Sequence, residues 1–276
     1  MIQSAELHSF WQRFPSDFLQ PASGTLTKLF LYTDVRVGWF PKLDLRGIHF
    51  PCLRSLTLGN HIFFSQYQVK WIISHSGTLE ELNLDHCSIL YQAGYAIEDW
   101  LDKDYCPRSQ NIAEHNHWSY SQFSYNLERQ EFLSMLRVPA FSLRWYHVFT
   151  LFAVSMHRLR VFRWGKSKHW LMSTTSRWAE PEGGTENRPI MPWEDEYDIK
   201  SWDAEDWYVV WNDWTHQYTA SFEPDPENSG WDTAILEKYW DIEWLALFDK
   251  YPDCDTKDRE ALQELQRKVE INTIVF

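Results

Sequence analysis

GTLEELNLDHCSI, residues 77–89, is the stretch from which the fold can be worked out. Its apolar side chains run from Leu79 to Ile89 with the spacing Leu-x-x-Leu-x-Leu-x-x-Cys-x-Ile. Successive side chains of a strand point to opposite faces, so Leu82 and Leu84 lie on the same face of a short strand. Leu79, Cys87 and Ile89 lie outside this strand, where the chain turns back. The stretch therefore predicts a strand followed by a turn.

Three other stretches carry the same spacing. GTLTKLFLYTD (24–34) and PCLRSLTLGNHIF (51–63) precede the first one, and HRLRVFRWG (157–165) follows it with aromatic residues in place of two leucines. The first leucines of the copies at 24–34, 51–63 and 77–89 are 27 and 26 residues apart. This period and the pattern L-x-x-L-x-L-x-x-N/C-x-L are those of leucine-rich repeats, whose units stack because none can bury its apolar face alone.

The expected fold class is therefore α/β, a short leucine-rich-repeat-like solenoid of strand plus helix units. We expect one domain over residues 1–276, with a repeat core at 24–170 that is interrupted by an irregular insertion at 91–140. Residues 171–276 are expected to form a mixed acidic part that packs on the core. Patterns along the chain predict helices at 65–76, 141–157 and 255–269, an acidic surface loop at 179–206, and paired strands at 207–211 and 218–222.

The net charge of −13 is distributed unevenly along the chain. Residues 1–179 hold 18 Lys/Arg and 14 Asp/Glu, whereas residues 180–276 hold 8 and 25. Residues 132–178 contain eight Arg/Lys and no acid. Such a basic stretch either binds nucleic acid or docks the acidic part of the same chain. A chain that is negative overall is repelled by phosphate backbones, so we expect no nucleic-acid partner.

Aromatic residues make up 17% of the chain, with 17 Trp, and either build the core or line a ligand pocket. The four cysteines form no CxxC pair, and residues 1–14 lack the basic and apolar segments of a signal peptide. Apolar runs are also shorter than the roughly 18–20 residues of a membrane span. We therefore expect an intracellular protein, cytoplasmic or nuclear, with reduced thiols and no membrane partner.

Several quoted stretches together resemble a known family. FPCLRSLTLGNHIF (50–63), WIISHSGTLEELNLDHCSIL (71–90), SLRWYHVF (142–149) and HRLRVFRWG (157–165) resemble, in order and spacing, the C-terminal leucine-rich half of fungal F-box proteins, and EALQELQRKV (260–269) fits their closing helix. In that family a helical F-box with a Leu-Pro opening joins a cullin-based ubiquitin ligase, and the repeats hold the substrate. Here residues 1–24 have no Leu-Pro opening, and 23 residues precede the first repeat, fewer than an F-box needs. The resemblance implies a recognition surface without the F-box.

Residues that alternate with the repeat leucines are expected on the concave face of a solenoid. They are Lys28, Phe30 and Tyr32; Ser55, Thr57 and Gly59; Glu81, Asn83 and Asp85; and Val161, Arg163 and Gly165. The candidate ligand-binding residues among them are Phe30, Tyr32, Thr57, Glu81, Asn83, Asp85 and Arg163. Glu81 and Asp85 lie roughly 13 Å apart along a strand, too far for a coupled carboxylate pair. The alternative is an ordinary solvated strand face.

Other motifs do not predict a site. His115 and His117, with Cys106 or Glu114, lack a second set of metal ligands at suitable spacing. GKS at 165–167 lacks the first glycine of a phosphate-binding loop, and DPENSG at 225–230 lacks the glutamate of a calcium loop. We expect no metal and no cofactor, and the sequence assigns no catalytic residue.

Two functions fit these observations. The first is a recognition module that binds a protein or peptide on an open, shallow concave face. The second is a cofactor-independent enzyme of fungal specialised metabolism, a cyclase or Diels–Alder-type pericyclase, which holds a small apolar ligand in a reactive conformation. The enzyme requires an enclosed aromatic-lined pocket of roughly 300–1,000 Å³, with the insertion and the acidic loop as its possible lids.

Overall fold

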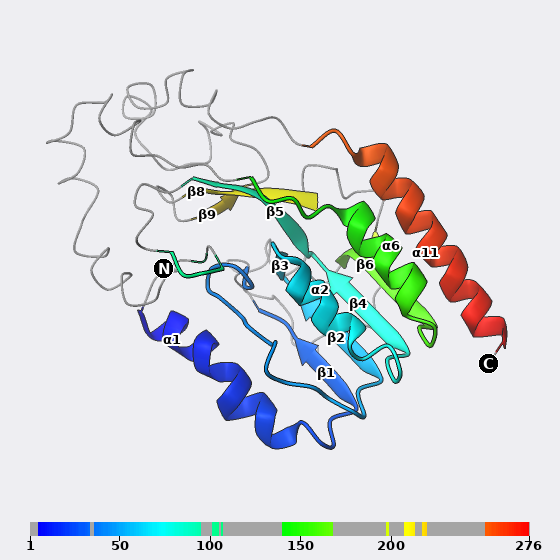
Figure 1. Ribbon diagram of the computed structural model, residues 1–276, viewed down its shortest axis with the longest axis horizontal. Coiled ribbons are helices and arrows are strands. Elements are labelled where there is room, and N and C mark those ends of the chain that lie inside the picture. The colour runs from blue at the N-terminus through cyan, green and yellow to red at the C-terminus, as the bar shows by residue number, and fades with distance from the viewer. Residues whose placement is uncertain are drawn as a thin grey trace, which may run out of the picture.

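A five-stranded sheet forms the centre of the molecule in the computed structural model, which describes residues 5–33, 36–94, 101–104, 106, 140–167, 197–198, 207–212, 217–219 and 252–275 (Figure 1). Its strands are β1 (Lys28–Leu31), β2 (Ser55–Gly59), β4 (Glu81–Asp85), β6 (Val161–Ser167) and β7 (Tyr197–Asp198), in that order. The first four are parallel, and β7 is antiparallel to β6. Parallel strands joined by helices confirm the expected α/β class.

The repeat leucines lie in register across these strands. Leu29, Leu56, Leu82 and Phe162 form one row, and Leu31, Leu58, Leu84 and Trp164 form the next. All are buried except Phe162, which is partly buried, and all pack in one core cluster. We call this side of the sheet the leucine face. The strands that carry the four sequence copies thus lie side by side, although the third and fourth copies start 80 residues apart.

A second sheet continues from the first after a corner in the chain. It contains β3 (Ile62–Phe63), β5 (Ser88–Gly94), β8 (Tyr208–Asn212) and β9 (Gln217–Thr219). The corners after β2 and β4 are Asn60 and His86, whose φ angles are 56° and 52°. The corners stack, because His86 Nδ1 donates to Asn60 Oδ1 at 2.6 Å and Asn60 Nδ2 donates to the Thr33 carbonyl at 2.7 Å.

Helices cover the leucine face. Figure 1 shows α2 (Gln66–Ile73) and α6 (Trp145–Ser155) on one side of the sheet, with α11 (Asp255–Val275) beside α6. Val69, Ile72, Phe149 and Phe152 are fully buried in the same cluster as the leucines, as their spacing in the sequence predicts. The closing helix extends to Val275, six residues beyond its predicted end.

The chain begins with a helical segment that the repeat pattern does not predict. α1 (Ala5–Phe14) is followed by one π-helical turn, η1 (Pro15–Leu19), and one 3-10 turn, η2 (Gln20–Ala22). Trp11 joins the core, and His8 packs on the Phe40 ring with 4.2 Å between ring centroids. α1 therefore faces the first repeat and the loop that follows it.

The range expected as an irregular insertion, 91–140, begins as regular structure. β5 runs through residue 94 and pairs in parallel with β8, with a register shift between Leu90 and Gln92. Leu101 and Cys106 pack in a second core cluster, and Lys42 Nζ forms ion pairs with Asp102 at 2.5 Å and Asp104 at 2.8 Å. Apart from 91–94, 101–104, 106 and 140, this range lies outside the described residues.

The structure describes residues 197–198, 207–212, 217–219 and 252–275 of the C-terminal part. β8 and β9 pair antiparallel, as the strand pair predicts, and α11 packs against α6. Of the acidic loop expected at 179–206, only residues 197–198 are described, and they form β7. The motifs at 115–117 and 225–230 lie outside the described residues.

Candidate recognition face

The sheet surface opposite the leucines carries the residues that the sequence assigns to the concave face. We call it the polar face. The strand register aligns them in rows: Lys28, Ser55, Glu81 and Val161; then Phe30, Thr57, Asn83 and Arg163; then Gly59, Asp85 and Gly165. Tyr32 follows β1 directly. Parallel pairing in register therefore brings together side chains that lie up to 133 positions apart in the chain.

Hydrogen bonds join the middle of the polar face into one network. Arg163 Nη1 donates to Glu81 Oε1 at 2.7 Å and to Asn83 Oδ1 at 3.0 Å. Asn83 Nδ2 donates to Thr57 Oγ1 at 3.0 Å and to Glu81 Oε1 at 3.2 Å, and Ser55 Oγ donates to Glu81 Oε2 at 3.0 Å. Burial opposes ionisation of Glu81, but these hydrogen bonds outweigh it and hold its pKa below the usual range.

A second arrangement closes the other end of the face. Tyr32 OH donates to Asp85 Oδ2 at 3.0 Å, and the Tyr32 ring stacks on Phe30 with 5.6 Å between centroids. To reach Asp85 from β1, the ring passes over Gly59 of β2. A Cβ atom at Gly59 would lie 2.1 Å from Tyr32 Cδ2, so only glycine leaves room for this contact.

The polar face is consequently divided into a closed part and an accessible part. Thr57, Asn83 and Asp85 are 4%, 1% and 0% exposed, so the face is not open along its whole length as the recognition hypothesis expects. Phe30 is 37% exposed, and the side chains of Arg163 and Glu81 are 34% and 28% exposed. A ligand on this face would touch Phe30, Glu81 and Arg163, whereas Thr57, Asn83 and Asp85 support them from below.

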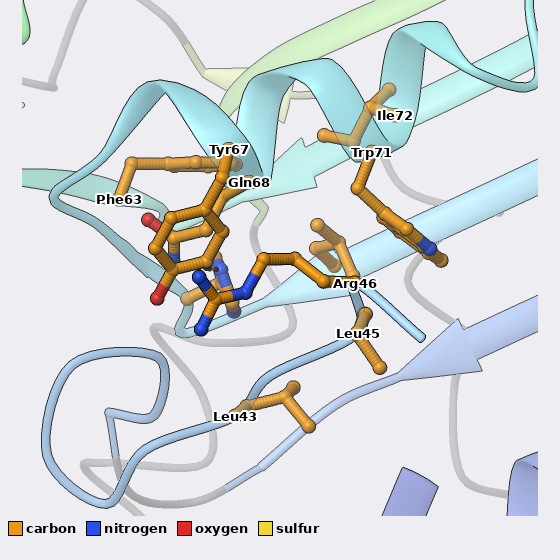
Figure 2. A pocket seen from close by; sticks show the side chains of 10 residues that line it. Leu43, Leu45, Arg46, Phe63, Tyr67, Gln68, Trp71 and Ile72 are labelled. Atoms are coloured by element: carbon orange, nitrogen blue, oxygen red, sulfur yellow. Dashed lines mark hydrogen bonds between the residues drawn. The ribbon is translucent and has the colours of Figure 1, made fainter. Parts of the chain in front are cut away.

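A small pocket lies on the leucine side, between α2 and the loop that precedes β2 (Figure 2). Apolar side chains form most of its wall, and Arg46, His61, Tyr67 and Gln68 provide its polar groups. The Arg46 guanidinium lies 4.0 Å from the centroid of the Tyr67 ring, and the buried Tyr67 hydroxyl has no hydrogen-bond partner among the described residues. The enclosed space holds about one water molecule, far less than a small-molecule site needs.

The imidazole in this pocket is held neutral by its surroundings. Gln68 Nε2 donates to His61 Nε2 at 3.1 Å, while Gln68 Oε1 accepts the backbone N–H groups of Phe64 and Ser65. Burial lowers the pKa of His61 to about 3. His61 and Cys87 occupy the Asn/Cys place of their repeats, and Cys87 Sγ donates to the Leu58 carbonyl at 3.2 Å. These contacts hold the turns that follow β2 and β4.

A buried polar group that sequence reasoning missed joins α11 to α6. Asp258 is 0% exposed; its Oδ1 accepts from the Tyr146 N–H at 2.7 Å, and its Oδ2 accepts from Tyr208 OH at 2.7 Å and Cys254 Sγ at 3.3 Å. Asp258 on α11 thus accepts a backbone N–H from the first turn of α6, more than 100 residues away in the sequence. The N-cap residue of α6 makes no side-chain hydrogen bond to that turn. Burial raises the pKa of Asp258, and it raises that of Cys254 to about 11. The thiol is therefore protonated and unreactive at neutral pH.

No group of three or more His, Cys, Asp or Glu side chains suited to a metal ion occurs within the described ranges. Within those ranges there is also no helix that is both long and apolar enough to cross a membrane. Comparisons with protein-family models, with curated proteins and with solved structures found no match.

Proposed function

We propose that this chain is a recognition module of the leucine-rich-repeat type, which binds a protein or peptide partner on the accessible part of its polar face. The observation that carries the proposal is the alignment of Phe30, Glu81 and Arg163 on three parallel strands of one sheet. The in-register leucine rows and the stacked corners support the repeat interpretation. The sequence resemblance to the leucine-rich half of fungal F-box proteins points the same way.

The hydrogen-bond network gives this surface a property that recognition needs. Arg163 is already held by Glu81 and Asn83, and Phe30 is held by the Tyr32 ring. Fixing a long side chain on binding costs about 0.5–1.5 kcal/mol, and a side chain that is fixed beforehand avoids much of that loss. A preorganised charged and aromatic surface favours a specific partner over non-specific adhesion.

Selection of peptides from a random display library on the purified full chain tests the proposal. We expect selected peptides that bind the wild type and lose about tenfold or more in affinity to Phe30→Ala or Arg163→Ala. Leu151→Ala on α6 is the matched control, because Leu151 has the same exposure of 37% as Phe30 and lies behind the leucine face. Peptides whose affinity is unchanged by Phe30→Ala and Arg163→Ala, or is reduced by Leu151→Ala, would contradict the proposal.

The alternative, a cofactor-independent cyclase or Diels–Alder-type enzyme, needs an enclosed pocket. The pocket in Figure 2 is too small to hold such a substrate, and most of the two segments expected as lids lies outside the described residues. We favour recognition because Phe30, Glu81 and Arg163 lie together on the polar face. Deleting the gene in its native host and comparing the metabolite profile with the parent decides between the two. An unchanged profile is the result that recognition predicts, and a lost or stereochemically scrambled product would establish an enzyme.

A further inference from the structure

We propose that the partner segment is acidic and extended, an inference that rests on the proposed function. It is based on a group of cations where the strands of the first sheet begin, which we call the basic rim. Its members are Lys28, Arg54, Arg158, Arg160 and Arg163. Arg163 is partly exposed and the other four are exposed. Lys28 and Arg163 lie on the polar face, whereas Arg54 and Arg160 follow the alternation of the leucines, so the basic rim runs along the edge of the sheet beside the polar face.

Backbone hydrogen bonds join the segments that carry these cations. Arg54 N–H donates to the Thr27 carbonyl, Glu80 N–H to the Arg54 carbonyl, and Arg160 N–H to the Glu80 carbonyl, each at 2.8 Å. The starts of β1, β2, β4 and β6 are thus adjacent. Arg158 Nη1 reaches the Gly77 carbonyl at 3.2 Å and joins the turns after α6 and α2.

The charge at this rim has the sign opposite to that of the whole chain. Among the described residues at these strand starts, five cations stand beside two carboxylates, Glu80 and Glu81; Glu81 is paired with Arg163, and Arg160 also has a contact of its own. The chain as a whole carries −13, so its average field repels anions. Because screening limits exposed charges to about 8–10 Å, an anionic segment that reaches the rim is governed by the local cations.

The spacing of the cations favours a peptide over a small anion. Lys28 on β1 and Arg163 on β6 are three strand spacings apart, roughly 14 Å across the sheet. About five extended residues of a peptide cover that length and can place a side chain at each cation. Phe30 projects from the same side of β1 as Lys28 and offers an apolar contact. We therefore infer acidic side chains on either side of an apolar one.

A polyanion of phosphates fits this surface less well than an acidic peptide. Nucleic-acid binding draws its affinity from many phosphate contacts along a basic stripe. Here Glu80 separates Arg54 from Arg160 at the edge of the sheet, and the rest of the chain is strongly acidic. A short peptide can place its carboxylates at the cations alone.

Fluorescence polarisation with three labelled peptide pools tests the inference on the full chain. The pools share one random composition of about twelve residues and differ only in whether half their positions are Asp/Glu, Asn/Gln or Lys/Arg. At about 0.15 M salt we expect the acidic pool to half-saturate at a concentration about tenfold lower than the neutral pool. The triple variant Lys28→Glu, Arg54→Glu, Arg160→Glu should remove that preference.

A matched triple variant, Lys70→Glu, Lys103→Glu, Lys268→Glu, changes the net charge equally at exposed sites away from the rim and should keep the preference. Equal binding of the acidic and neutral pools, or equal losses in both triple variants, would overturn the inference. So would binding of a single-stranded DNA of similar length as tight as that of the acidic pool. If the neutral pool binds best and depends on Phe30, the recognition function stands and the acidic preference fails. If no pool binds in a Phe30-dependent manner, both fail.

Discussion

The two faces of the first sheet are built from alternating residues of the same strands but are held in different ways. On the leucine face, eight aligned side chains pack against α2, α6 and the loop before β2. On the polar face, five side chains form one hydrogen-bond network, and Tyr32 covers Asp85. The first face is stabilised by the removal of apolar area from water, and the second by directional contacts.

This difference separates the side chains that are expected to set stability from those of the proposed binding surface. The side chains of the leucine face pack against other core residues, so they are not accessible to a ligand. The polar face has a buried layer that fixes its geometry and an accessible layer whose side chains are partly exposed to solvent. Changes on the leucine face should therefore unfold the chain, whereas changes in the accessible layer should alter binding alone.

The largest effect is expected at the centre of the leucine face. Leu82 is 0% exposed between Leu56 and Phe162, so Leu82→Ala removes buried methyl groups and leaves a cavity. We expect a loss of about 2–5 kcal/mol in the free energy of unfolding, measured by urea denaturation. Ser55→Ala on the polar face is the control and should cost no more than about 1 kcal/mol. Similar losses for both would mean that the two faces do not differ in this way.

A smaller difference is expected between the two carboxylates of β4. Asp85 is 0% exposed and accepts the Tyr32 hydroxyl, so Asp85→Ala leaves a buried donor without its partner and should cost roughly 3 kcal/mol. Glu81→Ala leaves Arg163 in contact with solvent and should cost about 1 kcal/mol or less. Urea denaturation of both variants checks the order, and a greater loss for Glu81→Ala would contradict the division of the face.

The imidazoles buried behind the sheet should make stability depend on pH. Burial lowers the pKa of His8 to about 4 from the value of 6.5 for a free side chain. Because the folded-state pKa is the lower one, the contribution is complete above about pH 6.5 and is lost as pH falls toward 4. For His8 alone the loss is at most about 3 kcal/mol. Thermal denaturation across this range should show a shallower pH dependence in His8→Leu, and an unchanged slope in that variant would refute the assignment.

The smallest effect concerns the close approach of Tyr32 to Gly59. Gly59→Ala places a methyl group against the ring, which must move and give up Asp85, at an expected cost of about 2 kcal/mol. In a Tyr32→Ala background the same substitution should cost less than about 0.5 kcal/mol, because the clash is gone. A double-mutant cycle measures this coupling, and additive effects would show that Tyr32 does not lie over Gly59 in solution.

Much of the leucine face could be predicted from the sequence. The period of the copies gives β1, β2 and β4, and the alternation within each copy gives the rows of the polar face residue by residue. The helices at 65–76 and 141–157 follow from apolar residues at i, i+3 and i+4. Both patterns are local, so short stretches of sequence contain all the information they need.

The burial of the polar face could not be predicted in the same way. Alternation assigns Asp85 to the same face as Glu81, but only the packing of Tyr32 over Gly59 makes one buried and the other accessible. From the sequence alone, Asp258 is expected to be an exposed acid in the first turn of α11. Its hydrogen-bond partner Tyr146 lies 112 residues away in the chain. Contacts between distant segments depend on the folded chain and leave no periodic signal.

Site-specific cross-linking of display-selected peptides is the most direct test of whether a partner binds the accessible part of the polar face. The photoreactive residue p-benzoylphenylalanine is placed at Phe30 in one protein and at Leu151 in another, two positions with equal exposure of 37% on opposite sides of the sheet. The account predicts peptide cross-links from position 30 and none from position 151. Cross-links from position 151, or from neither position, would contradict it.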